Sequence, residues 1–83
     1  MKETHAQREM PLSHLTQGTQ AEIVAFVEEN PLAQRIEEMG ITPGEKIEIV
    51  RLAPLGDPIE VKIRGYLLSL RRDEADLIKV RIT

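Results

Sequence analysis

Apolar and polar residues alternate along much of the chain, which is the pattern of β-strands that bury one face. The alternation is clearest at Ile59, Val61 and Ile63, which are separated by charged residues. The alternating stretches are residues 20–28, 46–53, 59–64, 66–70 and 77–82. Their lengths and their content of branched aliphatic side chains predict a mainly β fold with about five short strands.

Residues 31–39 depart from this pattern, because their apolar side chains recur at helical spacing. The members of this apolar stripe are Leu32, Ile36 and Met39. Asn30 suits the N-cap, Pro31 suits the first helical position, and Gly40 suits the left-handed residue after the helix. The segment predicts a helix over 31–39. Since the first strand is apolar on both faces, we expect this helix to cover its second face or one open mouth of the barrel.

Glycine and proline mark the corners between these elements. Residues 42–45, Thr-Pro-Gly-Glu, fit a type II turn, and Gly65 forms a pivot between two strands. The apolar positions change parity at Ile49 and Val50, which predicts a β-bulge. Short strands joined by tight corners are typical of small barrels. The pattern therefore predicts a small SH3-like barrel of about five strands with one inserted short α-helix.

The chain has 83 residues, which is the length of one small domain. Residues 1–9 are polar, and we expect them to form a flexible N-terminal tail that precedes a single domain over 10–83. Within that domain, Leu12 and Leu15 are spaced for a helical turn that seals one end of the barrel. Residues 71–75 predict another short helical turn before the last strand.

The composition excludes several classes of functional site. The sequence contains no cysteine, which excludes disulfides, thiolate zinc sites and cysteine nucleophiles. The net charge of −3 argues against nucleic-acid binding. No apolar run approaches the roughly 20 residues that cross a bilayer, and residues 1–9 lack a secretory signal. We expect a cytoplasmic chain without direct membrane insertion, which reaches the inner membrane only through a protein partner.

Few residues are placed to catalyse a reaction or to bind a metal ion. The histidines, His5 and His14, are isolated, and the glycines occur singly at corners rather than in a phosphate-binding loop, so we do not expect an enzyme. Asp73 and Asp76 are spaced to converge weakly on a hard cation, but a solvated surface is favoured. We therefore expect no cofactor and assign no metal-ligating residue. Weak binding of a divalent metal stays open.

Basic residues are concentrated in the last third of the chain. We expect Lys62, Arg64 and the outward residues of the last strand, Lys79 and Arg81, to form one basic strip. Apart from Tyr66, no aromatic residue is placed to stack a base on this strip. A solvated sheet face, or an interface for an acidic partner, is therefore favoured over a nucleic-acid site.

The corner at residues 53–58 is the strongest candidate for binding a protein. Leu55 lies at its tip between Pro54 and Gly56, where a large apolar side chain has little core to enter. It either folds back on its own hairpin or docks on another protein. Pro54 and Pro58 stiffen the tip, which lowers the entropy lost on binding. We predict the docking surface to be the groove between this hairpin and the helix 31–39.

Several short motifs occur together in the chain. They are Leu12 with Gly18, Met39-Gly40-Ile41-Thr42-Pro43-Gly44, Ala53-Pro54-Leu55-Gly56-Asp57-Pro58, Gly65-Tyr66 and Leu68-Ser69-Leu70-Arg71. In this combination, over roughly residues 10–82, the sequence resembles the ferrous iron transport protein A (FeoA) family. The resemblance implies a small SH3-like domain of a bacterial ferrous iron uptake system.

The same resemblance implies a partner, the membrane ferrous iron transporter with a cytosolic GTPase domain (FeoB). On this hypothesis the chain is a cytosolic accessory protein that docks on the transporter and modulates it. Leu55 would be the apolar anchor, the prolines a rigid frame, and the charged residues would set orientation. The predicted partner-binding residues are Pro54, Leu55, Asp57, Arg64, Tyr66 and Arg71. The oligomeric state stays undefined.

A second hypothesis comes from another class of protein. The chain would be an SH3-like module like those appended to metal-dependent regulators, and it would bind a divalent transition metal or a proline-rich segment. A gene for a large membrane GTPase beside this one would favour the first hypothesis, and a fused winged helix would favour the second.

Overall fold

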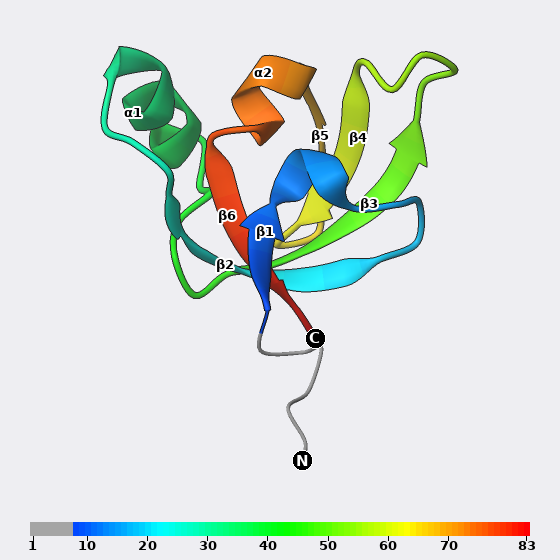
Figure 1. The fold of residues 1–83 in the computed structure, drawn as a ribbon, viewed down its shortest axis with the longest axis horizontal. Helices are drawn as coiled ribbons and strands as arrows, with labels where there is room; N and C mark the ends of the chain where they lie inside the picture. The colour runs from blue at the N-terminus through cyan, green and yellow to red at the C-terminus, as the bar shows by residue number, and fades with distance from the viewer. Residues whose placement is uncertain (1–7) are drawn as a thin grey trace.

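Residues 8–83, the part of the chain that the computed structural model describes, fold around one curled antiparallel sheet (Figure 1). The six strands are β1 (Glu9–Pro11), β2 (Gln20–Phe26), β3 (Lys46–Leu52), β4 (Ile59–Ile63), β5 (Tyr66–Leu70) and β6 (Ile78–Ile82). They lie in the order β1-β6-β2-β3-β4-β5, so β1 and β5 form the two edges. The predicted mainly β fold is confirmed.

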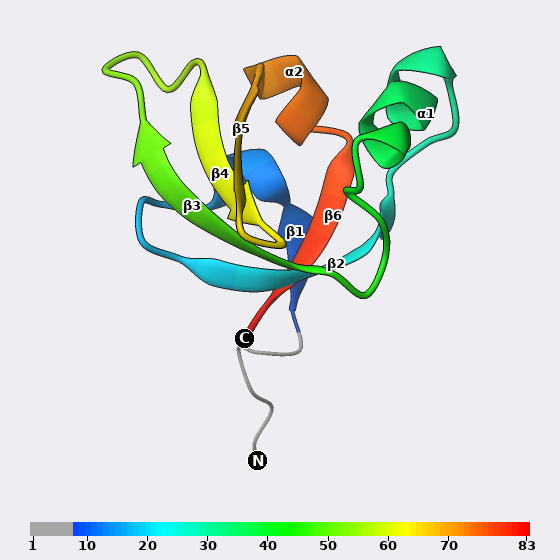
Figure 2. The ribbon, with the colours of Figure 1, turned by 180° about the vertical axis from the view of Figure 1, so that it is seen from behind.

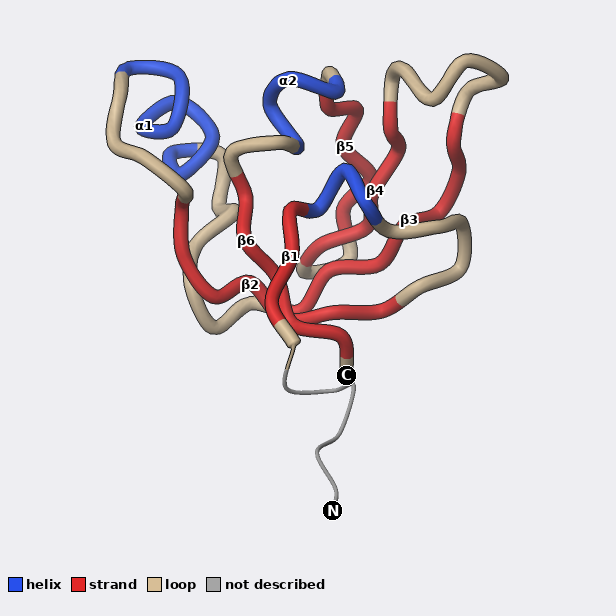
Figure 3. Tube along the Cα trace, in the orientation of Figure 1, coloured by secondary structure: helices blue, strands red, loops and turns tan. Residues whose placement is uncertain are grey.

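Three helical segments complete the domain: the 3₁₀ turn η2 (Leu12–His14), α1 (Pro31–Glu38) and α2 (Arg72–Ala75). Figure 3 shows the two α-helices beyond the ends of the strands, on the side of the molecule opposite the C-terminus. Within residues 8–83, no helix is long and apolar enough to cross a membrane.

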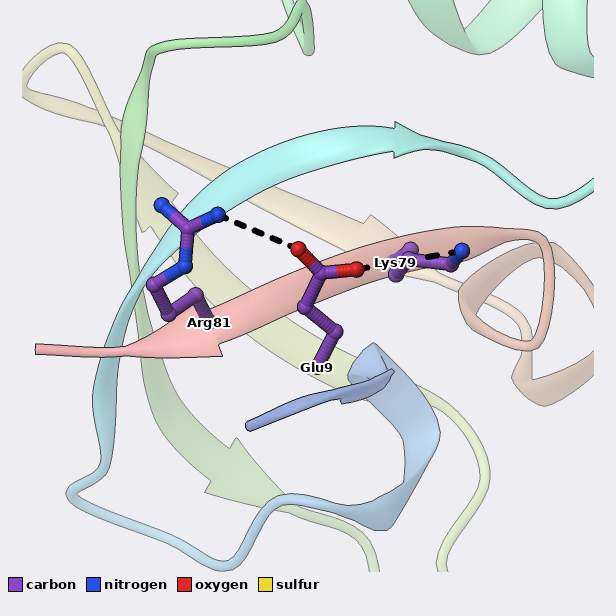
Figure 4. A network of polar contacts seen from close by, with 3 residues as sticks. All are labelled: Glu9, Lys79 and Arg81. Carbon is purple, nitrogen blue, oxygen red and sulfur yellow. Dashed lines mark hydrogen bonds and ion pairs between the residues drawn. The ribbon is translucent and has the colours of Figure 1, made fainter. Parts of the chain in front are cut away.

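The predicted boundary between the tail, residues 1–9, and the domain is wrong by one residue, because Glu9 belongs to the first strand. Residues 1–7 lie outside the part of the chain that the structure describes. Glu9 begins β1, which pairs antiparallel with β6 in the register Glu9 to Arg81. The Glu9 carboxylate lies between two β6 cations, 3.1 Å from Arg81 Nη2 and 3.9 Å from Lys79 Nζ (Figure 4). Complementary charge on exposed side chains therefore adds to the backbone pairing of this short edge strand.

The core is made of aliphatic side chains. Ile59, Val61 and Ile63 on β4 are at most 2% exposed, which confirms the predicted inward face. Leu12 and Leu15 are also buried, as predicted for residues that close one end of the barrel. No polar or charged side chain of residues 8–83 is buried. Hydrophobic burial, at about 25 cal/mol per Å² of apolar surface, is thus the main term that holds the sheet together.

Two irregularities bend the sheet. The register between β3 and β4 shifts between Ile49 and Arg51, as the parity change predicted. A second shift, between Ile23 and Ala25 on β2, was not predicted. Beyond it Phe26 packs against the core and Val27 is 54% exposed, although simple alternation had placed Val27 with the core residue Ile23. A bulge inserts one residue and so exchanges the two faces of the strand.

Helix α1 begins as the sequence predicts. The Asn30 side-chain oxygen accepts a hydrogen bond from the backbone N–H of Ala33 at 2.8 Å, and Pro31 takes the first helical position. Ile36 is fully buried and Leu32 partly buried, but Met39, the third member of the predicted stripe, is 47% exposed. Ala33 takes the buried position instead. Met39 follows the last helical turn, so helical spacing no longer fixes where it points.

Two turns set the direction of the hairpins. Glu45 N–H donates to the Thr42 carbonyl at 3.1 Å, and Gly44 has a φ of +95°, which confirms the type II turn. Between β4 and β5 the turn consists of Arg64 and Gly65, with φ values of +53° and +83°. Positive φ at both positions is the signature of a type I′ turn, which is usually made by Asn-Gly. An arginine in this conformation is uncommon.

We expect Asn30→Ala to lower the free energy of unfolding by about 1 kcal/mol, because the N–H of Ala33 loses its acceptor at the start of α1. Urea denaturation followed by circular dichroism measures the change. Asn30→Asp keeps the acceptor and should stay within about 0.5 kcal/mol of the parent. Gln34→Ala, at an exposed position of the same helix, is the matched control. Equal stability of Asn30→Ala and the parent would show that this cap does not stabilise the helix.

Candidate protein-binding site

The corner between β3 and β4 is a tight and well-braced tip. Gly56 N–H donates to the Ala53 carbonyl at 2.7 Å, and Ala53 N–H donates to the Pro58 carbonyl at 3.2 Å. The peptide bond between Asp57 and Pro58 is cis. Leu55, at the apex, is 91% exposed. It does not fold back on its own hairpin, so the first of the two alternatives that the sequence left open is wrong, and docking on another protein stays a prediction.

Helix α2 supports the tip from one side. The backbone N–H of Arg72 donates to Asp57 Oδ1 at 3.2 Å, which joins the tip to the first turn of α2. The Arg72 guanidinium also lies over Gly56, since a Cβ placed on that glycine would be 3.0 Å from Nη1. Asp57 therefore has a positioning role that its sequence context did not reveal. Arg72, which sequence reasoning did not select, is part of the same support.

The six residues predicted for partner binding do not form one cluster. Pro54, Leu55 and Asp57 lie at the tip, and Arg71 lies beside them because it follows β5 and precedes α2. Arg64 and Tyr66 lie at the other end of β4 and β5, where the two-residue turn joins these strands. The sequence thus selected residues from two separate ends of one hairpin.

The predicted groove between the tip and the helix 31–39 is not continuous, because α2 lies between them (Figures 1 and 2). Two smaller hollows replace it. One, of about 210 Å³, lies between α1 and α2 and is lined by Leu32, Arg35, Arg71, Asp73 and Glu74. The other, of about 310 Å³, lies beside the tip and is lined by Arg51, Leu52, Ala53, Pro54, Pro58, Glu60 and Ser69. The prediction of one groove is therefore wrong, and the most exposed apolar side chain at the tip is that of Leu55.

The predicted basic strip is also divided. Strand β4, with Lys62, and strand β6 are separated in the sheet by β2 and β3. On β6, the charges of Lys79 and Arg81 face the carboxylate of Glu9 (Figure 4). The strip therefore lacks the continuous positive surface that tracks a nucleic-acid backbone.

Asp73 and Asp76, the pair considered for weak metal binding, lie within α2 and directly after it. Asp76 accepts a short hydrogen bond from the Ser13 hydroxyl and so helps to join η2 to the end of α2. Among residues 8–83, no group of three or more histidine, aspartate or glutamate side chains is arranged to hold a metal ion.

A second exposed apolar surface was missed by sequence reasoning. It surrounds a pocket of about 400 Å³ between the end of α1 and β5, and its lining residues are Met39, Gly40, Ile63, Arg64, Tyr66, Leu67 and Leu68. Tyr66 is 71% exposed and Leu67 is 59% exposed. The sequence held one signal, because Leu67 breaks the apolar alternation of β5. We call this surface the β5 pocket.

Comparison with known proteins identifies the family of this chain. The family model described as the FeoA domain matches residues 10–82. The chain belongs to the FeoA domain family. This match favours the first of the two hypotheses drawn from the sequence, and it covers all the described strands except the first residue of β1.

Solved FeoA structures share the fold. A FeoA-like protein from Clostridium acetobutylicum is 36% identical and superposes with a TM-score of 0.86, over 92% of this chain and 88% of that one. FeoA from Stenotrophomonas maltophilia, an SH3 domain protein complexed with zinc, is 29% identical with a TM-score of 0.76, over 86% of this chain and 88% of that one. The predicted SH3-like fold is confirmed.

A curated relative carries the FeoA domain within a much larger protein. It is an Fe(2+) transport protein A/Fe(2+) transporter FeoB fusion protein from Porphyromonas gingivalis, and it is 42% identical over 73 residues. The match covers 88% of this chain but only 9% of the relative. In that protein, one polypeptide joins the FeoA part to the FeoB part.

We expect Asp57→Ala to loosen the tip of this FeoA domain, because the backbone N–H of Arg72 loses its acceptor. The free energy of unfolding should fall by about 1 kcal/mol, the usual net value of one hydrogen bond. Amide hydrogen exchange at Arg72 should accelerate at the same time. Asp57→Asn, which keeps an acceptor oxygen, is the control and should protect Arg72 nearly as well as the parent. If the exchange rate of the Arg72 amide were unchanged in Asp57→Ala, α2 would not support the tip through Asp57.

Proposed function

We propose that this FeoA domain acts in bacterial ferrous iron uptake by docking on the membrane iron transporter with a cytosolic GTPase domain, the FeoB type, and modulating it. The observation that carries the proposal is the fusion relative, in which a domain 42% identical to this chain is joined to FeoB. Joining two parts in one polypeptide raises their effective concentration and favours their contact. In our proposal the two parts meet at the cytoplasmic side of the inner membrane.

The braced tip supports docking as the mode of action. Leu55 projects from a turn that two backbone hydrogen bonds close and that α2 holds through Asp57. An apolar side chain held on a rigid support loses little conformational entropy when a partner covers it. Large apolar side chains that enter a pocket on the partner commonly contribute most of the affinity of an interface. Leu55 is therefore the anchor in our proposal.

The other predicted residues take roles that follow from their positions. Pro54 keeps the approach to Leu55 rigid, and Asp57 positions the tip through Arg72. Arg71, beside the tip, orients an acidic surface of the partner. Arg64 and Tyr66, at the far end of the hairpin, contact a separate part of the partner.

In this proposal the transporter performs the chemistry and the FeoA domain biases its assembly or its nucleotide cycle. Such a bias requires that the domain binds one state of the transporter more tightly than another. The FeoA domain is not a known enzyme family. Iron is then the cargo of the transporter.

We expect Leu55→Glu to keep the fold and to weaken binding to the cytosolic part of the FeoB-type transporter from the same organism by at least about tenfold, or 1.4 kcal/mol. The side chain is 91% exposed, so its replacement leaves the core unchanged. Isothermal titration calorimetry, carried out with and without guanine nucleotide, measures the affinity and its dependence on the nucleotide state.

Val27→Glu is the matched control, because it places the same charge at another exposed apolar residue, which lies at the opposite end of the sheet from the tip. It should bind like the parent. If Leu55→Glu and Val27→Glu both retained the parent affinity, the tip would not be the anchor. If the parent itself failed to bind in every nucleotide state, the proposed function would be wrong.

A further inference from the structure

The β5 pocket is lined mostly by apolar side chains, and the Tyr66 and Arg64 side chains add polar groups to its lining. Ile63 and Leu68 bring the edge of the core to its base, and Met39 and Tyr66 border it while remaining largely exposed. Of the seven residues that line it, only Arg64 is charged. A volume of about 400 Å³ accommodates one or two large side chains and lies within the range of small ligand sites.

The strand that borders this pocket has an unpaired edge. Strand β5 pairs with β4 alone and ends the sheet (Figure 2). Because the turn between them has two residues, Ile63 and Tyr66 form the hydrogen-bonded pair next to it. The N–H and C=O groups of Leu67 and Ser69 therefore point away from β4. Such a row of free donors and acceptors is the template on which an extended peptide adds as a further strand.

The charge at the rim has an unusual support. Arg64 has a φ of +53°, at a turn position where asparagine or glycine is the favoured residue. Its guanidinium lies 3.9 Å from the Glu45 carboxylate, and the Arg64 side chain is 61% exposed, so this ion pair is weak. A cation held at a conformational cost and paired only loosely is available to a carboxylate on an incoming ligand.

We propose that the β5 pocket binds an extended peptide segment of the transporter's cytosolic part, which adds to the free edge of β5. One apolar side chain of this segment enters the pocket, and a carboxylate near one end of the segment pairs with Arg64. Free backbone groups select an extended occupant, the apolar lining selects its side chain, and Arg64 selects its charge. The inference rests on the proposed function and gives the partner a second, separate contact besides the tip.

The probe is a set of overlapping 12-residue peptides that cover the cytosolic part of the FeoB-type transporter. They are titrated into the ¹⁵N-labelled full chain and followed by NMR. We expect at least one peptide with alternating apolar residues and an acidic end to shift the amide resonances of Met39, Leu67 and Ser69. Changing the acidic residue of that peptide to its amide should weaken binding about tenfold.

Three variants separate the parts of the site. Leu67→Pro removes an outward N–H of an edge strand, a position at which proline is tolerated, and should abolish strand addition. Met39→Glu places a charge in the apolar lining. Arg64→Asn removes the cation and creates the favoured Asn-Gly turn, so the fold should be at least as stable as that of the parent. It should weaken binding of the acidic peptide about tenfold and leave binding of the amide peptide unchanged, an outcome that a loss of folding cannot produce.

The same variants are then titrated with the whole cytosolic part of the transporter, with Val27→Glu as the control that binds like the parent. If that part binds the parent and loses affinity for Leu55→Glu, but binds Leu67→Pro, Met39→Glu and Arg64→Asn normally, the β5 inference is wrong and the proposed function stands. Concentration-dependent shifts of the β5 amides without any peptide would make a second copy of this chain the occupant and overturn the inference. If the parent does not bind, both proposals are wrong.

Discussion

The burial of branched aliphatic side chains on the inner side of one curled sheet is the constraint on which this small domain depends. No polar side chain of residues 8–83 shares that interior. Hydrophobic burial has no direction of its own, so it cannot by itself choose one strand register over another. The register is instead set at the corners, by the type II turn at 42–45, by the turn of Arg64 and Gly65, and by the bulges on β2 and β3.

The charged and polar side chains of residues 8–83 are all at least partly exposed, because the interior is aliphatic. Two surfaces stand out, the tip around Leu55 and the β5 pocket. They lie at opposite ends of β4, whose five residues span about 15 Å at 3.3 Å per residue. Two anchors at that separation fix the orientation of the partner, which one exposed leucine cannot do.

Arg64 occupies a turn position whose backbone conformation favours a different residue. The turn between β4 and β5 requires positive φ at two successive residues, and asparagine would satisfy the first at less conformational cost. The sequence places a guanidinium there, next to the free edge of β5, which borders the β5 pocket. Departures from a local rule are most often found where a side chain serves a partner rather than the fold.

The elements whose causes lie within a few residues of one another could be predicted before the fold was known. Asn30 and Pro31 start a helix wherever they occur before such a stripe, Pro43 and Gly44 make their turn, and strict alternation in β4 fixes its buried face. The tip was predictable for the same reason, because Pro54 and Pro58 bracket Leu55 within a few residues.

Which distant segments meet could be seen only in the folded domain. Glu9 was predicted to lie in the tail but belongs to a strand. Its partners, Lys79 and Arg81, lie about 70 residues further along the chain, so no local pattern could indicate this pairing. The fold places α2 between the tip and α1, and it brings Met39 to Leu67 around one pocket. Met39 follows a helix and Leu67 lies in an edge strand, so neither periodicity specifies their meeting. Pairings over such separations depend on how the whole sheet curls, and no local pattern encodes that curvature.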